Sequence, residues 1–255
     1  MSLNIFWRYF VLLIILVSCK KEEASQNEGK LLKRITISSI FGSKVDSFIY
    51  DSEKRLIQIK CIRGQDYDKI VEYDMAGMIS KVNYTYQGSD QYSFTFLRNT
   101  SGQIIKKITT PEPGYSFAYN HSYTYNSDGQ LASDTTYYQQ SDSIVYYYSY
   151  KYDGKGNIVE LNFMNLTNPN NQGNTTCIYD SNPNPFYSQS MNNYFIINNL
   201  TYLSRNNIVQ ELSSCCPPIK NQITYQTNQL PNKIISENPI FPNGPVYTTT
   251  LFEYW

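Results

Sequence analysis

The sequence predicts an all-β protein in which repeated antiparallel β-hairpins form one long, strongly twisted meander sheet. Three observations support this: the composition, a regular spacing of aromatic residues before polar turns, and a period-two alternation between the turns. Among its 255 residues are 25 Tyr but little Ala or Leu, a composition that favours pleated strands over helices. A meander of about 16 to 18 strands twists by roughly 20–25° per strand, so we expect a coiled sheet or an open or closed barrel.

The charge balance excludes one broad class of function. Lys and Arg together number 21, as do Asp and Glu, and the formal net charge is zero. Nucleic-acid binding depends on a basic field that displaces counterions from phosphates. We therefore expect no nucleic-acid partner.

Residues 1–19 predict a bacterial lipoprotein signal peptide. The apolar run from Tyr9 to Val17 is too short to span a bilayer but has the length of a signal-peptide core. It leads into Leu16-Val17-Ser18-Cys19, which resembles a lipobox. The resemblance implies lipidation of Cys19 and attachment to a membrane through the acyl chains. The alternative is an uncleaved anchor helix.

Residues 20–30 predict a flexible tether, because they are polar and lack periodicity. The tether begins Lys20-Lys21-Glu22-Glu23, which resembles the surface-export signal of Bacteroidetes lipoproteins. The resemblance implies an outer-membrane lipoprotein exposed at the cell surface. The remaining residues, 31–255, form one repeat domain.

An aromatic residue precedes each polar turn and marks the repeat. These markers lie 23, 23, 29, 27, 27, 23, 23 and 29 residues apart, which is typical of a repeat architecture: Tyr50, Tyr73, Phe96, Tyr125, Tyr152, Tyr179, Tyr202, Tyr225 and Tyr254. After most markers comes a polar turn and then an aliphatic residue, and the best-preserved turns begin with Asp or Asn and contain Gly. Asp and Asn side chains bond nearby backbone amides in turns, and Gly supplies positive φ.

The best-preserved turns resemble the YD repeat of the RHS/YD-repeat superfamily. They are Tyr152-Asp153-x-x-Gly156-Asn157-Ile158 and Tyr73-Asp74-x-x-Gly77-Met78. The chain most resembles small Bacteroidetes lipoproteins with degenerate YD-like repeats and unknown function. The resemblance covers about residues 31 to 255 and weakens after Tyr179 and Tyr225. The toxin encapsulation of large RHS shells is not implied at this length.

Between the turns, apolar and polar residues alternate. Tyr92, Phe94 and Phe96 share one strand face, and Ser93 and Thr95 share the other. This pattern places aromatic rings inside and hydroxyl groups towards water. A transmembrane barrel is the alternative, but it needs an outward apolar band and would make the lipid anchor redundant.

The connections opposite the tight turns vary, and variable loops on a rigid scaffold often bind partners. They are residues 109–114, 138–142, 165–174, 213–218 and 237–245. Tyr147 and Tyr137 lie on the face opposite to Tyr146, Tyr148 and Tyr138, so they are candidates for an exposed aromatic patch that binds glycan or protein. The alternatives are loops that tolerate insertion and rings that only fill the sheet.

The sequence offers little for catalysis. His121 is the only histidine, and its setting favours a strand position over a catalytic role. Cys61, Cys177, Cys215 and Cys216 lack metal-site spacing; disulfides and unpaired thiols remain equally open. We therefore expect no cofactor, no metal and no enzymatic activity.

Three functions remain open. The first is a lipid-anchored, surface-exposed binding or scaffold module for glycan or protein partners. The second is a purely structural envelope component. The third is a glycoside hydrolase that uses two carboxylates inside the curved sheet.

Overall fold

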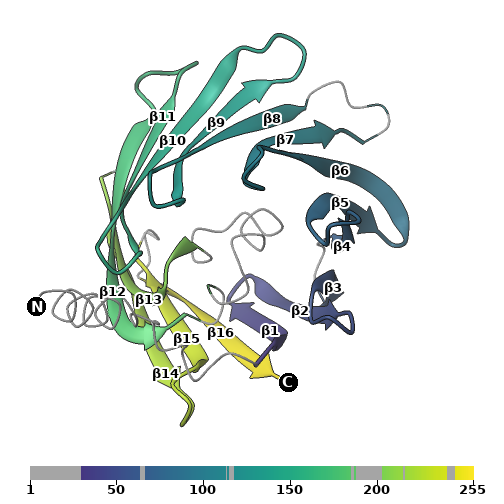
Figure 1. Cartoon of the computed structure of the whole chain (residues 1–255). Coiled ribbons are helices and arrows are strands. Elements are labelled where there is room, and N and C mark those ends of the chain that lie inside the picture. Colours follow the sequence, from purple (N-terminus) through teal and green to yellow (C-terminus); the bar gives the residue numbers. More distant parts are fainter. Residues whose placement is uncertain are drawn as a thin grey trace, which may run out of the picture.

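The computed structural model describes residues 30–63, 67–112, 114, 118–184, 187, 203–214, 216–239 and 245–255. Sixteen strands lie in these residues (Figure 1). They are β1 (Leu32–Ser39), β2 (Gly42–Tyr50), β3 (Leu56–Arg63), β4 (Asp68–Tyr73), β5 (Ile79–Tyr86), β6 (Ser89–Arg98), β7 (Ile104–Thr110), β8 (Tyr119–Tyr125), β9 (Leu131–Tyr138), β10 (Ile144–Tyr152), β11 (Ile158–Asn165), β12 (Gln172–Pro183), β13 (Asn206–Ser213), β14 (Ile219–Tyr225), β15 (Pro231–Asn238) and β16 (Val246–Tyr254).

The strands form a closed barrel in which each pairs antiparallel with its neighbours in sequence. β1 and β16 close it, with Ile35 opposite Phe252. The predicted all-β meander is therefore confirmed, and the open alternatives are replaced by closure. Twist accumulates across so many strands, and closure removes the two free edges. The described residues include no helix long and apolar enough to cross a membrane.

One rim of the barrel, here called the tip rim, consists of the tight turns. At the turn between β10 and β11, Asp153 Oδ1 accepts hydrogen bonds of 2.9 Å from the amides of Lys155 and Asn157. Asn126 Oδ1 does the same for Asp128 and Gln130 at the next turn along the rim. The short side chain at the start of each turn thus satisfies amides that the strands leave unpaired.

The fourth position after the aromatic marker requires positive φ. Gly77, Gly129 and Gly156 occupy it with φ of 73°, 77° and 85°, as the sequence predicts. Lys54 and Gln229 adopt φ of 62° and 65° at the turns that lack this glycine. The degenerate repeats therefore keep the turn geometry and accept a left-handed non-glycine residue.

The marker tyrosines tie neighbouring strands together next to the tip rim. Six of their hydroxyls each donate a hydrogen bond of 2.6 to 3.0 Å to the carbonyl of the residue that opens the preceding strand, whereas the Tyr225 hydroxyl bonds Asp180 Oδ2. The pairs are Tyr50–Leu32, Tyr73–Leu56, Tyr125–Ile104, Tyr152–Leu131, Tyr179–Ile158 and Tyr254–Pro231. This repeated bond explains why the sequence places a tyrosine, and not another aromatic residue, before most turns.

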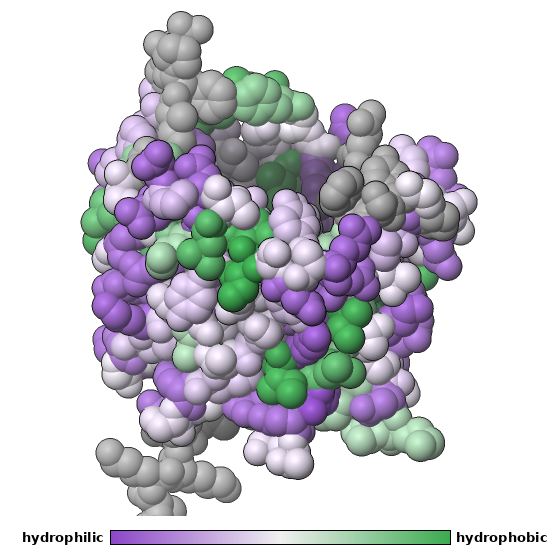
Figure 2. All heavy atoms as spheres, turned by 90° about the horizontal axis from the view of Figure 1, so that it is seen from above, coloured by the Kyte–Doolittle hydropathy of each residue, from purple (hydrophilic) through white to green (hydrophobic). Residues whose placement is uncertain are grey.

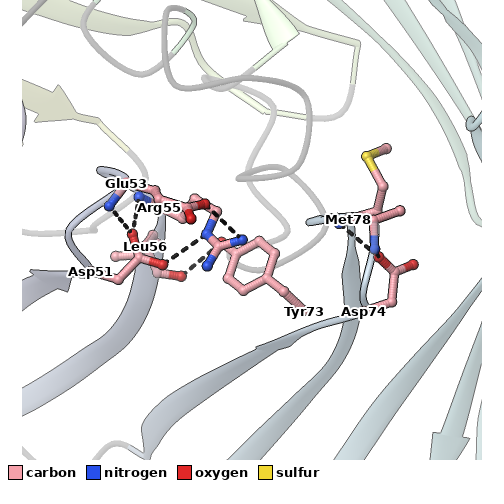
Figure 3. Close-up of polar contacts among 8 residues, drawn as sticks. Asp51, Glu53, Arg55, Leu56, Tyr73, Asp74 and Met78 are labelled. Carbon is pink, nitrogen blue, oxygen red and sulfur yellow. Dashed lines mark hydrogen bonds and ion pairs between the residues drawn. The ribbon is translucent and has the colours of Figure 1, made fainter.

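Figure 3 shows this arrangement at two neighbouring turns. Asp51 Oδ2 accepts a 2.7 Å hydrogen bond from Arg55 Nε, and the Arg55 guanidinium lies 4.8 Å from the Tyr73 ring centre. The Tyr73 hydroxyl in turn bonds the Leu56 carbonyl at 2.9 Å. Hydrogen bonds from Arg55 and its amide lower the pKa of the Asp51 carboxyl.

The structure changes two of the predicted markers. Arg98, not Phe96, pairs with Ile104 after the turn, and its guanidinium bonds the Ile79 carbonyl at 2.9 Å as a tyrosine would. Tyr179 pairs directly with Ile208, so β13 follows β12 in the barrel. The predicted marker Tyr202 lies between these two strands, outside the described residues.

The lumen differs between its two ends. Next to the tip rim, the aliphatic residue that follows five of the turns is at most 4% exposed: Leu56, Ile79, Ile104, Leu131 and Ile158. Towards the other rim, inward rings such as Tyr92, Tyr146 and Tyr148 stay partly exposed, although they face the inside of a closed barrel. The lumen is therefore packed at the tip end and accessible to solvent towards the variable rim.

The outer wall is mixed. Besides polar groups it carries outward apolar side chains that are 37–45% exposed, which are Ile49, Ile70, Leu97, Met164, Ile178, Leu212 and Leu251. Hydrophobic side chains form small separate patches among hydrophilic and intermediate ones on the face shown in Figure 2, and a hollow interrupts that face near its upper edge. One continuous outward row crosses five strands and consists of Thr124, Ser133, Ser149, Asn162 and Asn174. The predicted hydroxyl and amide groups are thus present on the outer face, where they alternate with exposed apolar side chains.

Candidate binding site inside the barrel

Strands β7 to β11 bring two inward rows of polar and aromatic side chains together. Directly paired residues of an antiparallel sheet share a face, so the registers define the rows. The first row is Lys107, His121, Thr136, Tyr146 and Asn165. The second row is Tyr123, Asp134, Tyr148 and Phe163. Neighbouring strands lie about 4.8 Å apart, so the first row extends over roughly 19 Å.

His121 and Asp134 form the polar centre of these rows. His121 Nδ1 lies 2.9 Å and 3.2 Å from the two carboxylate oxygens of Asp134, and 3.2 Å from Thr136 Oγ1. Burial lowers the pKa of His121 against the opposing effect of the Asp134 hydrogen bond. The neutral ring therefore carries its proton on Nδ1 and donates it to Asp134, which leaves Nε2 as a hydrogen-bond acceptor.

Lys107 places a cation beside this pair. It is 3% exposed, and its Nζ lies 4.7 Å from the Phe94 ring centre. Burial lowers its pKa to about 8, partly offset by the charge of Asp134. Lys107 and Asp134 together leave the cluster without net charge near neutral pH.

Aromatic rings continue the wall beyond the polar centre. The Phe163 ring centre lies 5.2 Å from that of Tyr148 and 5.8 Å from that of Tyr146. On the other side of Lys107, Tyr84 and Tyr92 stack at 4.3 Å with an angle of 19° between their planes. A lumen lined by partly exposed rings around a few fixed polar groups is typical of a small-molecule site.

The predicted aromatic patch on the outer wall does not form. Tyr147 faces outward, as expected, but it is only partly exposed, and Tyr137 is buried at 8% exposure. The Lys106 ammonium lies 5.3 Å from the Tyr137 ring centre and contributes to this cover. The inward tyrosines, which the sequence assigned to a packed core, are the ones that line accessible space.

The inward carboxylates each have a separate environment. Asp134 bonds His121, Asp46 pairs with Lys44 at 3.0 Å, and burial raises the pKa of Glu211. Each of these three carboxylates therefore has its own local environment. Among the described residues no group of three or more His, Cys, Asp or Glu side chains could hold a metal ion.

The single histidine and the cysteines that the sequence offers for chemistry either fill positions in strands or lie outside the described residues. His121 fills a strand position in β8, as predicted. Cys61 and Cys177 are free thiols, and burial raises the pKa of Cys177 to about 11. Cys215 and Cys19, for which lipidation is predicted, lie outside the described residues.

The variable connections gather at the rim opposite the tips, here called the variable rim. The turn between β1 and β2 presents Ile40 and Phe41, each 73% exposed. Residues 166–171 between β11 and β12 form a compact loop, in which the Asn165 side chain caps Thr167 and Asn168. The variable rim surrounds the accessible end of the lumen.

Comparisons with known proteins show the fold. No family model and no curated protein matches the chain. The chain is similar to a porin-like protein from Bacteroides uniformis ATCC 8492, with a TM-score of 0.59 and 13% identity over 88% of this chain and 98% of that chain. A porin-like protein from Bacteroides vulgatus ATCC 8482 gives a TM-score of 0.47 at 13% identity over the same shares. A TcdB2-TccC3-Cdc42 structure gives 0.36 at 17% identity, over 81% of this chain but 10% of that chain.

Proposed function

We propose that the protein is a non-catalytic binding module of the bacterial cell envelope, held at the outer membrane by a lipid on Cys19 and displayed at the cell surface. A protein with a similar fold over nearly its whole length is described as porin-like and comes from a Bacteroides species, which supports an envelope location. A purely structural envelope component is the second candidate. The observation that favours binding is the solvent-accessible lumen with its fixed polar cluster.

The outer wall supports a barrel that stands in water. A transmembrane barrel presents an apolar band about 25 Å tall to lipid. Here the exposed apolar side chains of the outer wall are interrupted by a row of hydroxyl and amide groups, in which Thr124 Oγ1 lies 2.7 Å from Ser133 Oγ. Ion pairs also lie on the outer face, between Arg34 and Glu253 at 3.2 Å and between Lys151 and Glu160 at 2.8 Å. A lipid anchor on the tether therefore has a purpose that a membrane-embedded barrel would not give it.

The position of the first strand orients the barrel. β1 starts at the tip rim, where Trp255 donates its amide to the Leu31 carbonyl at 3.0 Å. The tether of residues 20–30 thus leaves from the tip rim and spans at most about 36–40 Å when extended. We infer that the tips face the membrane and the variable rim points away from it.

A screen of glycans and envelope proteins tests this function. The protein is produced from Ala24 onward, which keeps every described strand. A first variant has the loop 166–171 shortened, and a second carries Phe41→Ser at the variable rim. The matched control is Met75→Ser, a fully exposed apolar residue at the tip rim.

The proposal expects a specific ligand whose binding falls in at least one variable-rim variant and stays unchanged in Met75→Ser. Loss of binding only in the tip-rim control would reverse the orientation. No ligand in either panel would favour the purely structural role.

A further inference from the structure

The polar cluster of Lys107, His121 and Asp134 has bonding capacity that the protein does not use. Asp134 holds His121 through Nδ1, so His121 Nε2 points its lone pair elsewhere, and the described residues supply no donor for it. The Lys107 ammonium lies over the Phe94 ring and has no hydrogen-bond partner among the described residues. Neither atom is among the fully buried polar atoms that lack a partner, so both reach the solvent of the lumen, where water or a ligand can bond them.

The two unused groups lie next to each other. Lys107 and His121 are direct partners across β7 and β8, and the side chains of such partners start about 5 Å apart. One group donates and the other accepts. Adjacent hydroxyls of a sugar ring match this pair, because a hydroxyl both accepts and donates hydrogen bonds.

The charge of the cluster selects among sugars. The Asp134 carboxylate already balances the Lys107 ammonium, and the unprotonated Nε2 of His121 would repel the carboxylate of an acidic sugar. A neutral ring adds no charge to this buried setting. The cluster therefore favours a neutral saccharide over a uronate.

The aromatic wall supplies the second element of a sugar site. In the same inward row as His121 lies Tyr146, two strands away and so about 10 Å distant. Its ring is partly exposed and packs against Phe163 at 5.8 Å. The apolar face of a pyranose can stack on such a ring while a neighbouring unit reaches the polar centre.

We propose that the lumen binds a neutral oligosaccharide, with one sugar unit hydrogen-bonded to Lys107 Nζ and His121 Nε2 and the next stacked on Tyr146. The site deepens the proposed binding function and rests on it for the biological role. It lies inside the barrel, whereas the first screen tests the variable rim.

Strand alternation provides matched controls. Lys106 neighbours Lys107 but faces outward opposite Ser122, and Tyr147 neighbours Tyr146 but faces outward opposite Thr135 and Met164. Lys107→Met and Tyr146→Ala change the lumen. Lys106→Met and Tyr147→Ala make the same chemical changes on the outer wall.

Titration calorimetry on the protein from Ala24 onward measures the binding. The probes are cellotriose, mannotriose, maltotriose and xylotriose, with trigalacturonate as the acidic comparison. We expect at least one neutral trisaccharide to bind more tightly than trigalacturonate. Lys107→Met should weaken it about tenfold or more, because a charged donor is lost, and the two outer variants should bind like the parent.

Four results would overturn the luminal site: no binding of any neutral probe, equal or tighter binding of trigalacturonate, binding unaffected by Lys107→Met, or equal loss in the outer variants. Tyr146→Ala repeats the test without touching the buried cation, so a folding defect in Lys107→Met does not decide the outcome. A ligand that needs the variable rim but not Lys107 would leave the proposed function standing and remove the luminal site. A trisaccharide whose binding needs Lys107 but not the variable rim would support the luminal site and remove the proposed contacts at the rim.

Discussion

Gly156→Val tests the turn geometry on which the repeat depends. Gly156 has a φ of 85°, a conformation that costs a residue with a side chain about 1–2 kcal/mol and a β-branched residue at least as much. A Cβ at this position would also lie 3.1 Å from Arg205 Nε and 3.3 Å from Arg205 Cδ. We therefore expect the free energy of unfolding to fall by about 1–3 kcal/mol.

Gly154→Val in the same turn is the matched control. The Cβ that it adds meets no atom within 4 Å, and Gly154 does not have positive φ. Its effect should stay within about 0.5 kcal/mol. Urea unfolding and thermal denaturation measure both variants, and a loss of 1 kcal/mol corresponds to a melting-temperature shift of about 2–4 °C at this chain length. Equal stability of the two variants would refute the assignment of the turn.

Three further predictions concern the tip rim. Tyr152→Phe leaves the Leu131 carbonyl without its 2.9 Å hydrogen bond and should cost about 1–3 kcal/mol in urea unfolding, whereas Tyr147→Phe on the outer wall should cost less than about 0.5 kcal/mol. Asp153→Ala removes the acceptor of two turn amides and should cost about 0.5–2 kcal/mol by the same measurement, with Asp128→Ala, which only donates its amide to Asn126, as the near-neutral comparison. Burial raises the pKa of Tyr125, Tyr152, Tyr179 and Tyr254. The unfolded chain therefore loses protons from about pH 10 that the folded chain keeps, and stability should begin to fall between pH 9 and pH 11 and continue to fall at higher pH. Constant stability across that range would contradict the buried tyrosine hydroxyls.

The fold was largely accessible from the sequence because its rules are local. The Asp-x-x-Gly turns and the alternation on either side of them specify hairpins, and consecutive hairpins pair without long crossovers. Barrel closure was left open, because it depends on twist summed over the whole sheet and not on any one segment.

The misplaced markers have a physical explanation. An arginine side chain can donate to the same carbonyl as a tyrosine hydroxyl, so Arg98 takes the place of the expected aromatic residue. Phe96, two positions earlier on the same face, was therefore mistaken for the marker. Asp180, directly after Tyr179, still accepts hydrogen bonds from backbone amides as a turn residue does, here from Asn182 and Asn207. Only the strand pairing shows that these amides come from distant positions.

The candidate site was less accessible than the fold. Ile104-Ile105-Lys106-Lys107-Ile108 does not reveal which lysine faces inward, since that depends on the bulge between Leu97 and Arg98. Asp134 was one acidic residue among many until the register placed it between Tyr123 and Tyr148. The solvent access of the inward tyrosines follows from the width of the closed barrel, which is not a local property.

Detergent-phase partitioning tests most directly whether a lipid, and not the barrel wall, holds the protein at the membrane. Both proteins are produced in a bacterium that exports and lipidates lipoproteins. One is the full chain, and in the other residues 1–19 are replaced by a cleavable export signal that lacks the cysteine predicted to be lipidated. We predict that the full chain enters the detergent phase and that the unlipidated form is folded and stays in the aqueous phase. An unlipidated, folded barrel in the detergent phase would contradict the account, because its outer wall would then bind lipid directly.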